Sequence, residues 1–233
     1  MLKVDLHLHT KDDPADVISY DFHHLIDTAA ERGFDALSVT LHDRDVSDPH
    51  MFDYARDRGI TLLPGVERTI EGRHVLLINF PQPTDHIRTF DELRRVRTES
   101  KGLVIAPHPF FPDSSCLRSL MDTHADLFDA VEWSYFWTGG LNFNARAARW
   151  ATEHGKPLVA NSDLHDLRQL GRTYSIVFAE RDPDAICSAI RDGRVSVYTS
   201  PVPKLELAKV LTGMFRRGNK APVTVDTPTL ATT

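Results

Sequence analysis

Residues 2–9 read LKVDLHLH, and this stretch alternates apolar and polar side chains along its whole length. A period of two predicts a half-buried β-strand. The apolar positions are Leu2, Val4, Leu6 and Leu8. His7 and His9 stand two positions apart, so a strand directs both imidazoles to the same face, a few ångströms from each other. Two neutral imidazoles in that arrangement can hold one divalent cation. The alternative, for this motif alone, is a pair of polar histidines at a strand end.

The rest of the chain alternates short apolar runs with amphipathic segments. Further strands are expected at residues 36–41, 60–66, 74–80, 103–106, 130–133 and 158–160. Helices are expected at residues 21–32, 49–58, 90–100, 142–154 and 182–191. Strands alternating with helices predict an α/β fold with a mainly parallel sheet, and roughly seven such units suit a closed or nearly closed barrel. The pattern fades near Arg216, so residues 216–233 are expected to form a flexible tail.

Composition narrows the class of protein. The 233 residues carry 27 basic and 33 acidic side chains, a net charge of −6, which disfavours a nucleic-acid binder with a broad basic surface. With 41% hydrophobic residues, the chain is typical of a soluble globular protein large enough for a sizeable core. Cys116 and Cys187 cannot form a disulfide framework, which suits a reducing compartment. Asp5 and His7 come too early for a signal peptide, and no apolar run is long enough for a membrane span, so we expect a cytoplasmic protein.

Residue types that bind metals follow one expected strand after another. They are His7 and His9, His42, Glu67, His108, and Asp163 with His165. The carboxyl ends of the strands of a parallel barrel meet on one face, which carries the active site. We therefore expect these residues to converge in one pocket, together with His74, which begins an apolar run.

Each of these residues, taken alone, has a plain structural alternative. Glu67 is compatible with a solvated strand end, and His74 with a half-exposed surface histidine. His108 lies between Pro107 and Pro109, which are expected to hold the backbone extended and to fix the direction of the ring. Its alternative is a structural histidine. Asp163 and His165 repeat the spacing of the first histidine pair, and this repetition favours a shared metal site.

Five short motifs, taken in order, resemble those of the PHP family, the polymerase and histidinol phosphatase domain of metal-dependent phosphoesterases. They are DLHLHT at residues 5–10, VTLHD at 39–43, PGVE at 64–67, APHP at 106–109 and NSDLH at 161–165. The resemblance covers nearly all of residues 1–215, which we expect to form a single PHP metal-dependent hydrolase domain. It implies a distorted (βα)7 barrel, similar to a TIM barrel, with a trinuclear metal site.

The resemblance also implies which residues bind metal. The first metal would take His7, His9, Glu67 and Asp163; the second Glu67, His74 and His108; the third His42 and His165. Glu67 would bridge two metals, and Glu67, Asp163 and His165 are the implied catalytic residues. The expected cofactors are two to three divalent ions of manganese, iron or zinc.

Two departures from the family pattern leave details open. The third metal's remaining ligand should come from the loop KDDPADVISY, where Asp16 fits the spacing best and Asp13 is the alternative. Leu41 stands where the family often has an aspartate before the second-motif histidine, so the His42 ring is expected to have a different orienting partner.

Other residues have weaker claims to the site. Lys11, Arg68 and Arg172 are candidates for binding a substrate phosphate, with a surface cation as the alternative for each. The stretch WSYFW at residues 133–137 is expected in the core or at the barrel rim, with a substrate-pocket wall as the alternative.

The function implied is hydrolysis of a small phosphomonoester or phosphodiester by metal-activated water. One alternative is a nuclease or phosphodiesterase acting on short oligonucleotides, since both reactions attack phosphorus. The other is a non-catalytic PHP module. The expected partner is a small phosphorylated substrate, without membrane binding, and long nucleic acid is disfavoured by the acidic balance. The sequence does not indicate the oligomeric state.

Overall fold

The computed structural model describes residues 1–217, whose strands form two five-stranded sheets. The first sheet has the order β10-β9-β1-β2-β3. It contains β1 (Leu2–Leu8), β2 (Ala36–Val39), β3 (Thr61–Leu63), β9 (Thr173–Val177) and β10 (Val195–Thr199). The second sheet has the order β4-β5-β6-β7-β8. It contains β4 (Gly65–Ile70), β5 (Arg73–Ile78), β6 (Leu103–Ala106), β7 (Ala130–Ser134) and β8 (Leu158–Asn161).

The expected α/β class is confirmed, but the expectation of mainly parallel pairing is wrong. β9 runs antiparallel to both β1 and β10, and β5 runs antiparallel to β4 and β6. One cause lies in the sequence: Glu71 and Gly72 both have positive φ, 49° and 75°, which suits a two-residue hairpin between β4 and β5. Pro64, which lacks an N–H, divides the single strand expected at residues 60–66 into β3 and β4, which belong to different sheets.

The ladders do not close into a barrel among the residues described, but the two sheets meet at two isolated bridges. Leu8 pairs with Leu164, and His42 pairs with Glu67. The residues at and beside these bridges include several of the expected metal ligands, so the junctions between the sheets bring the site together.

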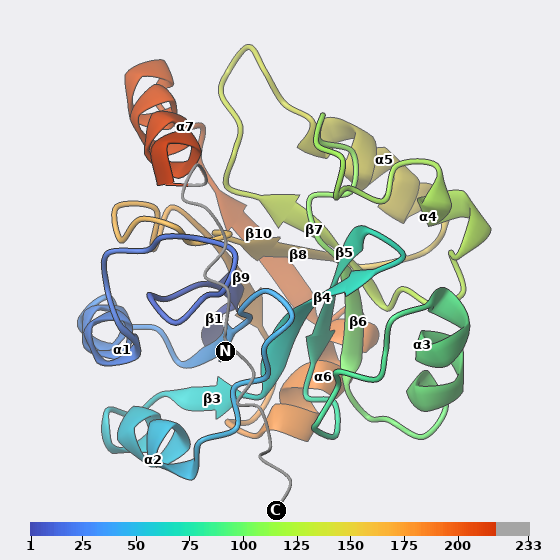
Figure 1. The fold of residues 1–233 in the computed structure, drawn as a ribbon, viewed down its shortest axis with the longest axis horizontal. Helices are drawn as coiled ribbons and strands as arrows, with labels where there is room; N and C mark the ends of the chain where they lie inside the picture. Colours follow the sequence, from blue (N-terminus) through green and yellow to red (C-terminus); the bar gives the residue numbers. More distant parts are fainter. Residues whose placement is uncertain (218–233) are drawn as a thin grey trace, which may run out of the picture.

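Helices surround the strands (Figure 1). They are α1 (Phe22–Glu31), α2 (Pro49–Asp57), α3 (Phe90–Arg97), α4 (Leu120–Thr123), α5 (Asn144–Glu153), α6 (Pro183–Arg191) and α7 (Lys204–Arg217). Side chains define where several begin: Asp21 caps α1, and Thr89 with Glu92 forms a capping box on α3. Pro183 in the first turn of α6 follows the cap residue Asp182.

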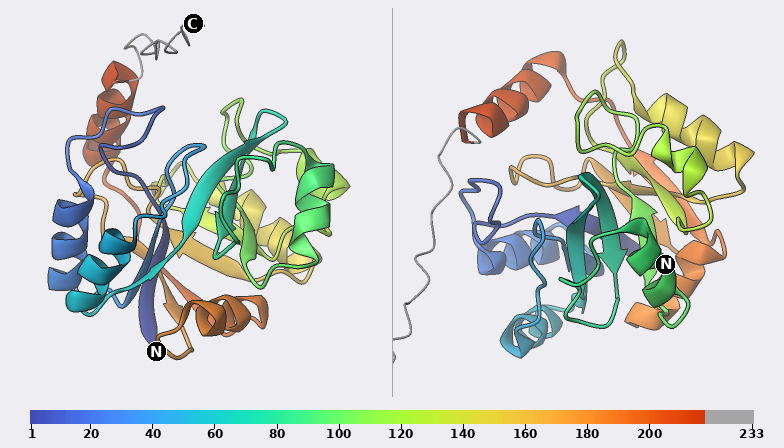
Figure 2. Two further views of the ribbon diagram at one scale, coloured as in Figure 1. Left: turned by 60° about the horizontal axis from the view of Figure 1, so that its bottom comes forward. Right: turned by 45° about the vertical axis from the view of Figure 1, so that its right-hand side comes forward.

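The core has an interior cluster that both sheets share. It takes apolar side chains from β1, β2, β3, β5, β6, β7, β8 and β9, and α6 adds Ile186, Cys187, Ala189 and Ile190. Two outer clusters pack α1 and α2 against one sheet and α3 and α5 against the other. Figure 2 (left) shows α6 and α7 at opposite ends of the strands. One end of the interior is therefore filled with apolar side chains, and the polar site lies toward the other.

Four elements were not expected from the sequence: β9, β10, α4 and α7. Residues 216 and 217, expected in a flexible tail, belong to α7, and the rest of that expectation, residues 218–233, lies outside the described residues. Within residues 1–217, no helix has the length and apolar character needed to cross a membrane.

Candidate metal centre

The carboxylate of Glu67 lies at the centre of the expected cluster and is almost fully buried. Its Oε2 atom lies 3.1 Å from Nε2 of both His7 and His42, and 3.4 Å from Nε2 of His9. Its Oε1 atom lies 2.8 Å from Nδ1 of His74 and 3.3 Å from Nε2 of His108. Five imidazoles from distant parts of the sequence therefore face one carboxylate.

Asp163, His165 and Asp16 extend the cluster on the side of β1. The Asp163 Oδ1 atom lies 3.5 Å from His7 Nε2 and 3.6 Å from His9 Nε2. Nε2 of His165 lies 3.1 Å from Oδ2 of Asp16. All the residues that we expected to converge, His42 included, thus lie in one continuous site.

The backbone adopts an uncommon conformation at two of these residues. His108 has φ of 30° and Asp163 has φ of 48°, in the left-handed region that non-glycine residues rarely occupy. The expectation of extended backbone at His108, between its two prolines, is therefore wrong. Neighbouring bonds hold both: the His108 N–H donates to Oε2 of Glu132, and the Leu164 N–H donates to the His7 carbonyl. Backbone strain of this kind concentrates at functional sites.

Asp13 orients two of the histidines. Its Oδ2 atom lies 2.8 Å from Nδ1 of His9 and 3.0 Å from Nδ1 of His42. Its Oδ1 atom accepts the backbone N–H groups of Ala15 and Asp16. These contacts occupy the Asp13 carboxylate, whereas Oδ2 of Asp16 faces Nε2 of His165, so Asp16 stays the expected loop ligand with Asp13 as the alternative. Asp13 is also the orienting partner for His42 that the sequence left open.

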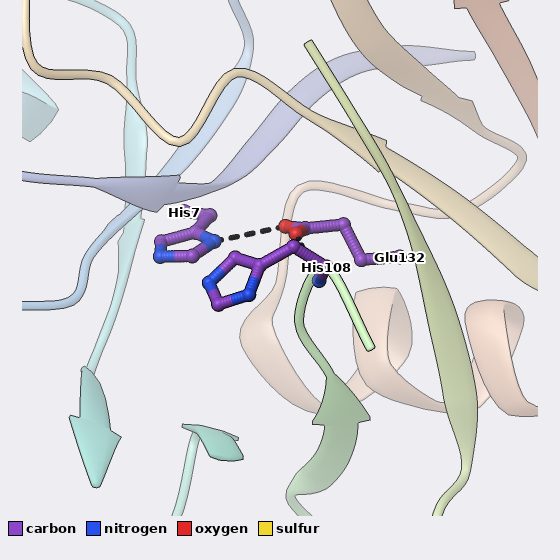
Figure 3. Close-up of side chains that lie close together, drawn as sticks. All are labelled: His7, His108 and Glu132. Carbon is purple, nitrogen blue, oxygen red and sulfur yellow. Dashed lines mark hydrogen bonds and ion pairs between the residues drawn. The ribbon is translucent and has the colours of Figure 1, made fainter. Parts of the chain in front are cut away.

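Glu132 on β7 does the same for His7, and the sequence analysis missed it. Its Oε1 atom lies 2.9 Å from His7 Nδ1 and accepts from Nδ2 of Asn161 at 2.9 Å, and its Oε2 accepts the His108 N–H at 2.8 Å. Figure 3 shows this carboxylate between the two histidines. Glu132 is fully buried at an inward-facing strand position. A charged residue inside the apolar run AVEWS was the signal available in the sequence.

These contacts determine which ring nitrogens face the site. A carboxylate only accepts, so Nδ1 of His7, His9 and His42 carries a proton and Nε2 points inward. The contact from His165 Nδ1 to the Asp163 carbonyl, at 2.9 Å, has the same effect. His108 also turns Nε2 toward Glu67 and places Nδ1 3.4 Å from Cys116 Sγ. In neutral rings these Nε2 atoms have no proton, and bare nitrogens facing carboxylate oxygens repel them unless a cation lies between.

The donor set fits divalent metal ions. The buried Nε2 atom of His9 has no hydrogen-bond partner among residues 1–217. Among the described residues, five triads have ligand atoms within 4.8 Å of one another: His7–His9–Glu67, His42–Glu67–His74, His9–Asp163–His165, His9–Asp13–His42 and His7–His108–Glu132. Mixed imidazole and carboxylate ligands suit manganese, iron and zinc.

The pKa values of the cluster residues also favour positive charge at this site. Burial alone would raise the pKa of Glu67, but the imidazoles of His7, His74 and His42 hold it well below its usual range. Burial would lower the pKa of His42, yet Glu67 and Asp13 raise it to about 9. Burial would also raise the pKa of Asp163, but His7 and His165 lower it. Bound cations can replace these protons.

The cluster opens into a pocket of about 710 Å³. Asp16, His42, Glu67, His74, His108, Asp163 and His165 line its floor. Phe111, Pro112, Phe136, Leu141, Phe143 and Leu207 form an apolar wall. Phe136 belongs to the WSYFW stretch, whose alternative interpretation as a pocket wall this placement favours.

The three phosphate-binding candidates are not among the lining residues. Lys11 lies 3.1 Å from Asp21, and the buried Arg68 contacts Asp43. Arg172 lies 3.1 Å from Glu206. Each cation thus has a carboxylate partner that is not itself a lining residue.

Comparison with known proteins agrees with this fold. Residues 142–195, which include Asp163 and His165, match a family model described as PHP-associated. No curated protein sequence matches the chain.

Solved structures cover more of it. A two-domain protein from Bacteroides vulgatus containing a predicted PHP-like metal-dependent phosphoesterase is 21% identical, with a TM-score of 0.62 over 91% of this chain and 69% of that protein. PsfC from Pseudomonas syringae is 16% identical, with a TM-score of 0.61 over 91% of this chain and 95% of that protein.

A nuclease is also among the similar structures. The lesion-specific endonuclease PfuEndoQ from Pyrococcus furiosus is 19% identical, with a TM-score of 0.60 over 84% of this chain but only 57% of the endonuclease. Together with the family match, these structures confirm the resemblance to the PHP family, with a PHP-like fold over most of the chain.

Proposed function

We propose that this PHP-like chain is a metal-dependent hydrolase of small phosphate esters. One observation carries the proposal: five imidazoles and the Asp163 carboxylate surround Glu67, with the ring nitrogens held facing inward. The similar structure that contains a predicted metal-dependent phosphoesterase supports it.

The proposed cofactors are two to three divalent ions of manganese, iron or zinc in a trinuclear site. The proposed ligands are His7, His9, Asp16, His42, Glu67, His74, His108, Asp163 and His165. Such ions neutralise the charge of a phosphate ester and lower the pKa of bound water toward neutrality. We also propose that residues 1–215 form a single domain of the distorted (βα)7 barrel type and that the protein is cytoplasmic.

The chain's own residues would contribute position and selectivity. Glu67 offers an oxygen to each side of the cluster, so it would fix the spacing between two ligand sets. Asp13 and Glu132 keep protons on the outward ring nitrogens of His9, His42 and His7, which leaves the inward nitrogens free to bind. Asp163 and His165 would complete the ligand cluster beside β1, and the apolar wall of the pocket would limit the entry of water.

A second candidate is a nuclease acting on short oligonucleotides, and the similarity to PfuEndoQ favours it. This similarity weakens the expectation, based on net charge, that long nucleic acid is not a substrate. Against the nuclease stands the pocket itself, because its lining residues in the described part of the chain include no lysine or arginine. Nucleic-acid sites normally carry such cations along the phosphate backbone.

The test is a screen of purified protein, reconstituted separately with manganese, iron and zinc, against phosphomonoesters, phosphodiesters and single-stranded oligonucleotides. We expect phosphate release from small esters, and its loss after chelation. Cleavage of oligonucleotides alone would replace the first candidate with the second. Inactivity on every substrate, with metal bound, would favour the non-catalytic module.

A further inference from the structure

The wall of the pocket distinguishes among phosphate esters, and this inference rests on the proposed function. Five large apolar side chains and a proline line the same pocket as the candidate ligands. Leu141 is 51% exposed, although it is a large apolar residue, and Phe111, Phe136 and Phe143 are only partly buried. Part of the apolar surface therefore stays exposed at the pocket, while Leu207 is buried with Tyr135 and Val202, and Phe136 packs against that cluster.

The aromatic part of the wall begins at a proposed metal ligand. The Phe111 ring lies 6.4 Å from the His108 ring in an edge-to-face arrangement, and the Phe143 ring follows at 5.2 Å from Phe111. An organic group attached to a phosphate at the cluster would therefore meet rings at once. Aromatic rings attract other rings in tilted or edge-to-face contacts of this spacing.

The distribution of charge around the pocket also favours an uncharged organic group on the substrate. Apart from the ligand cluster, Asp113 is the one charged lining residue in the described part of the chain. Its carboxylate lies in the exposed part of the rim and accepts from the Ser115 N–H. The wall thus offers no cation to a second phosphate or carboxylate on the substrate, while the volume of about 710 Å³ lies within the usual range for small-molecule sites.

We propose that the preferred substrates carry one phosphate ester joined to an uncharged, ring-bearing organic group, which packs against Phe111, Phe136 and Phe143. The ring provides apolar area that a small alkyl or polyol ester lacks.

A matched pair of substrates tests this. Ethyl phosphate and 2-phenylethyl phosphate have closely similar leaving groups and differ by one phenyl ring. We expect kcat/KM of the metal-reconstituted protein to be ~10-fold or more higher for the phenyl compound, the scale of partly burying one ring. Phe143→Ala should reduce this ratio several-fold. Phe178→Ala, which removes an exposed aromatic residue that is not among the pocket lining, should leave it unchanged.

Binding provides a second readout that does not need turnover. Titration calorimetry with propylphosphonate and 3-phenylpropylphosphonate, which cannot be hydrolysed, should give the same order of affinity and the same loss in Phe143→Ala. Equal kcat/KM for the two esters, or equal affinity for the two phosphonates, would overturn the inference and leave the proposed hydrolase intact. Preferred binding of the phenyl phosphonate without hydrolysis of any ester would support the preference for a ring-bearing group and overturn the proposed hydrolase.

Discussion

Replacing Glu67 with glutamine is the most informative single change. Glutamine keeps the size of the side chain but removes its charge and puts an NH2 group where one oxygen was. Five ring nitrogens lie between 2.8 and 3.4 Å from the two oxygens, so both oxygens face ligands. No rotamer of the amide can present an acceptor to both sides of the cluster.

The expected loss of turnover is at least ~100-fold, the scale seen when a positioned catalytic or electrostatic group is removed. We also expect Glu67→Gln to bind at least one metal ion fewer than the unmodified protein. The fold should survive, because Glu67 pairs with Leu76 in the β4–β5 ladder and with His42 in the bridge through backbone atoms.

Steady-state kinetics on the best ester from the screen measures the effect, and circular dichroism checks folding. Glu99→Gln is the matched control, because Glu99 is exposed and lies outside the pocket. A folded Glu67→Gln protein with full activity and unchanged metal content would refute the bridging role.

Three further predictions concern the residues around the cluster. Glu132→Gln should weaken metal affinity by ~10- to 100-fold, measured by competition with a chelating dye, because one amide oxygen cannot take both positions that now accept from the His7 ring and from the His108 N–H; unchanged affinity would contradict that role. Asp16→Asn should remove one ion and leave the others, whereas Asp13→Asn should weaken binding at His9 and His42, with exposed Asp12→Asn as control; elemental analysis showing the opposite assignment would reverse the two roles. The free energy of unfolding of the chelator-treated protein should fall as pH rises from 6.5 to about 9. Folding raises the pKa of His42 from 6.5 to about 9, so protonated His42 stabilises the fold fully below pH 6.5, and this contribution is lost as His42 deprotonates near pH 9. Thermal unfolding at pH 6.5 and 9, with and without metal, measures this, and a metal-free protein that is more stable at pH 9 would contradict it.

Residue types at strand ends were sufficient to predict the cluster. His7 and His9 fall on one face of β1 because a strand has a period of two, and the polar residues that close the other apolar runs lie beside them. That reasoning assumes parallel strands, and it holds at the cluster because β1 pairs in parallel with β2, and β7 pairs in parallel with β6 and β8.

The direction of strand pairing, and the carboxylates that orient the histidine rings, could not be predicted in the same way. Whether β5 runs parallel or antiparallel to β4 depends on the positive φ values of Glu71 and Gly72, and Arg73 begins the returning strand at once. Glu132 is recognisable only when β7 is placed beside His7, a contact across 125 positions of sequence. The roles of Asp13 and Asp16 likewise depend on loop hydrogen bonds that spacing does not encode.

Metal stoichiometry tests the central claim most directly. Protein purified without chelators, and the same protein after reconstitution, should contain two to three divalent ions per chain by elemental analysis. His9→Ala should bind fewer, because it removes the buried ring nitrogen for which the described part of the chain provides no hydrogen-bond partner. Exposed His50→Ala should match the unmodified protein. One ion or none per chain after reconstitution, or an unchanged content in His9→Ala, would contradict the proposed metal centre.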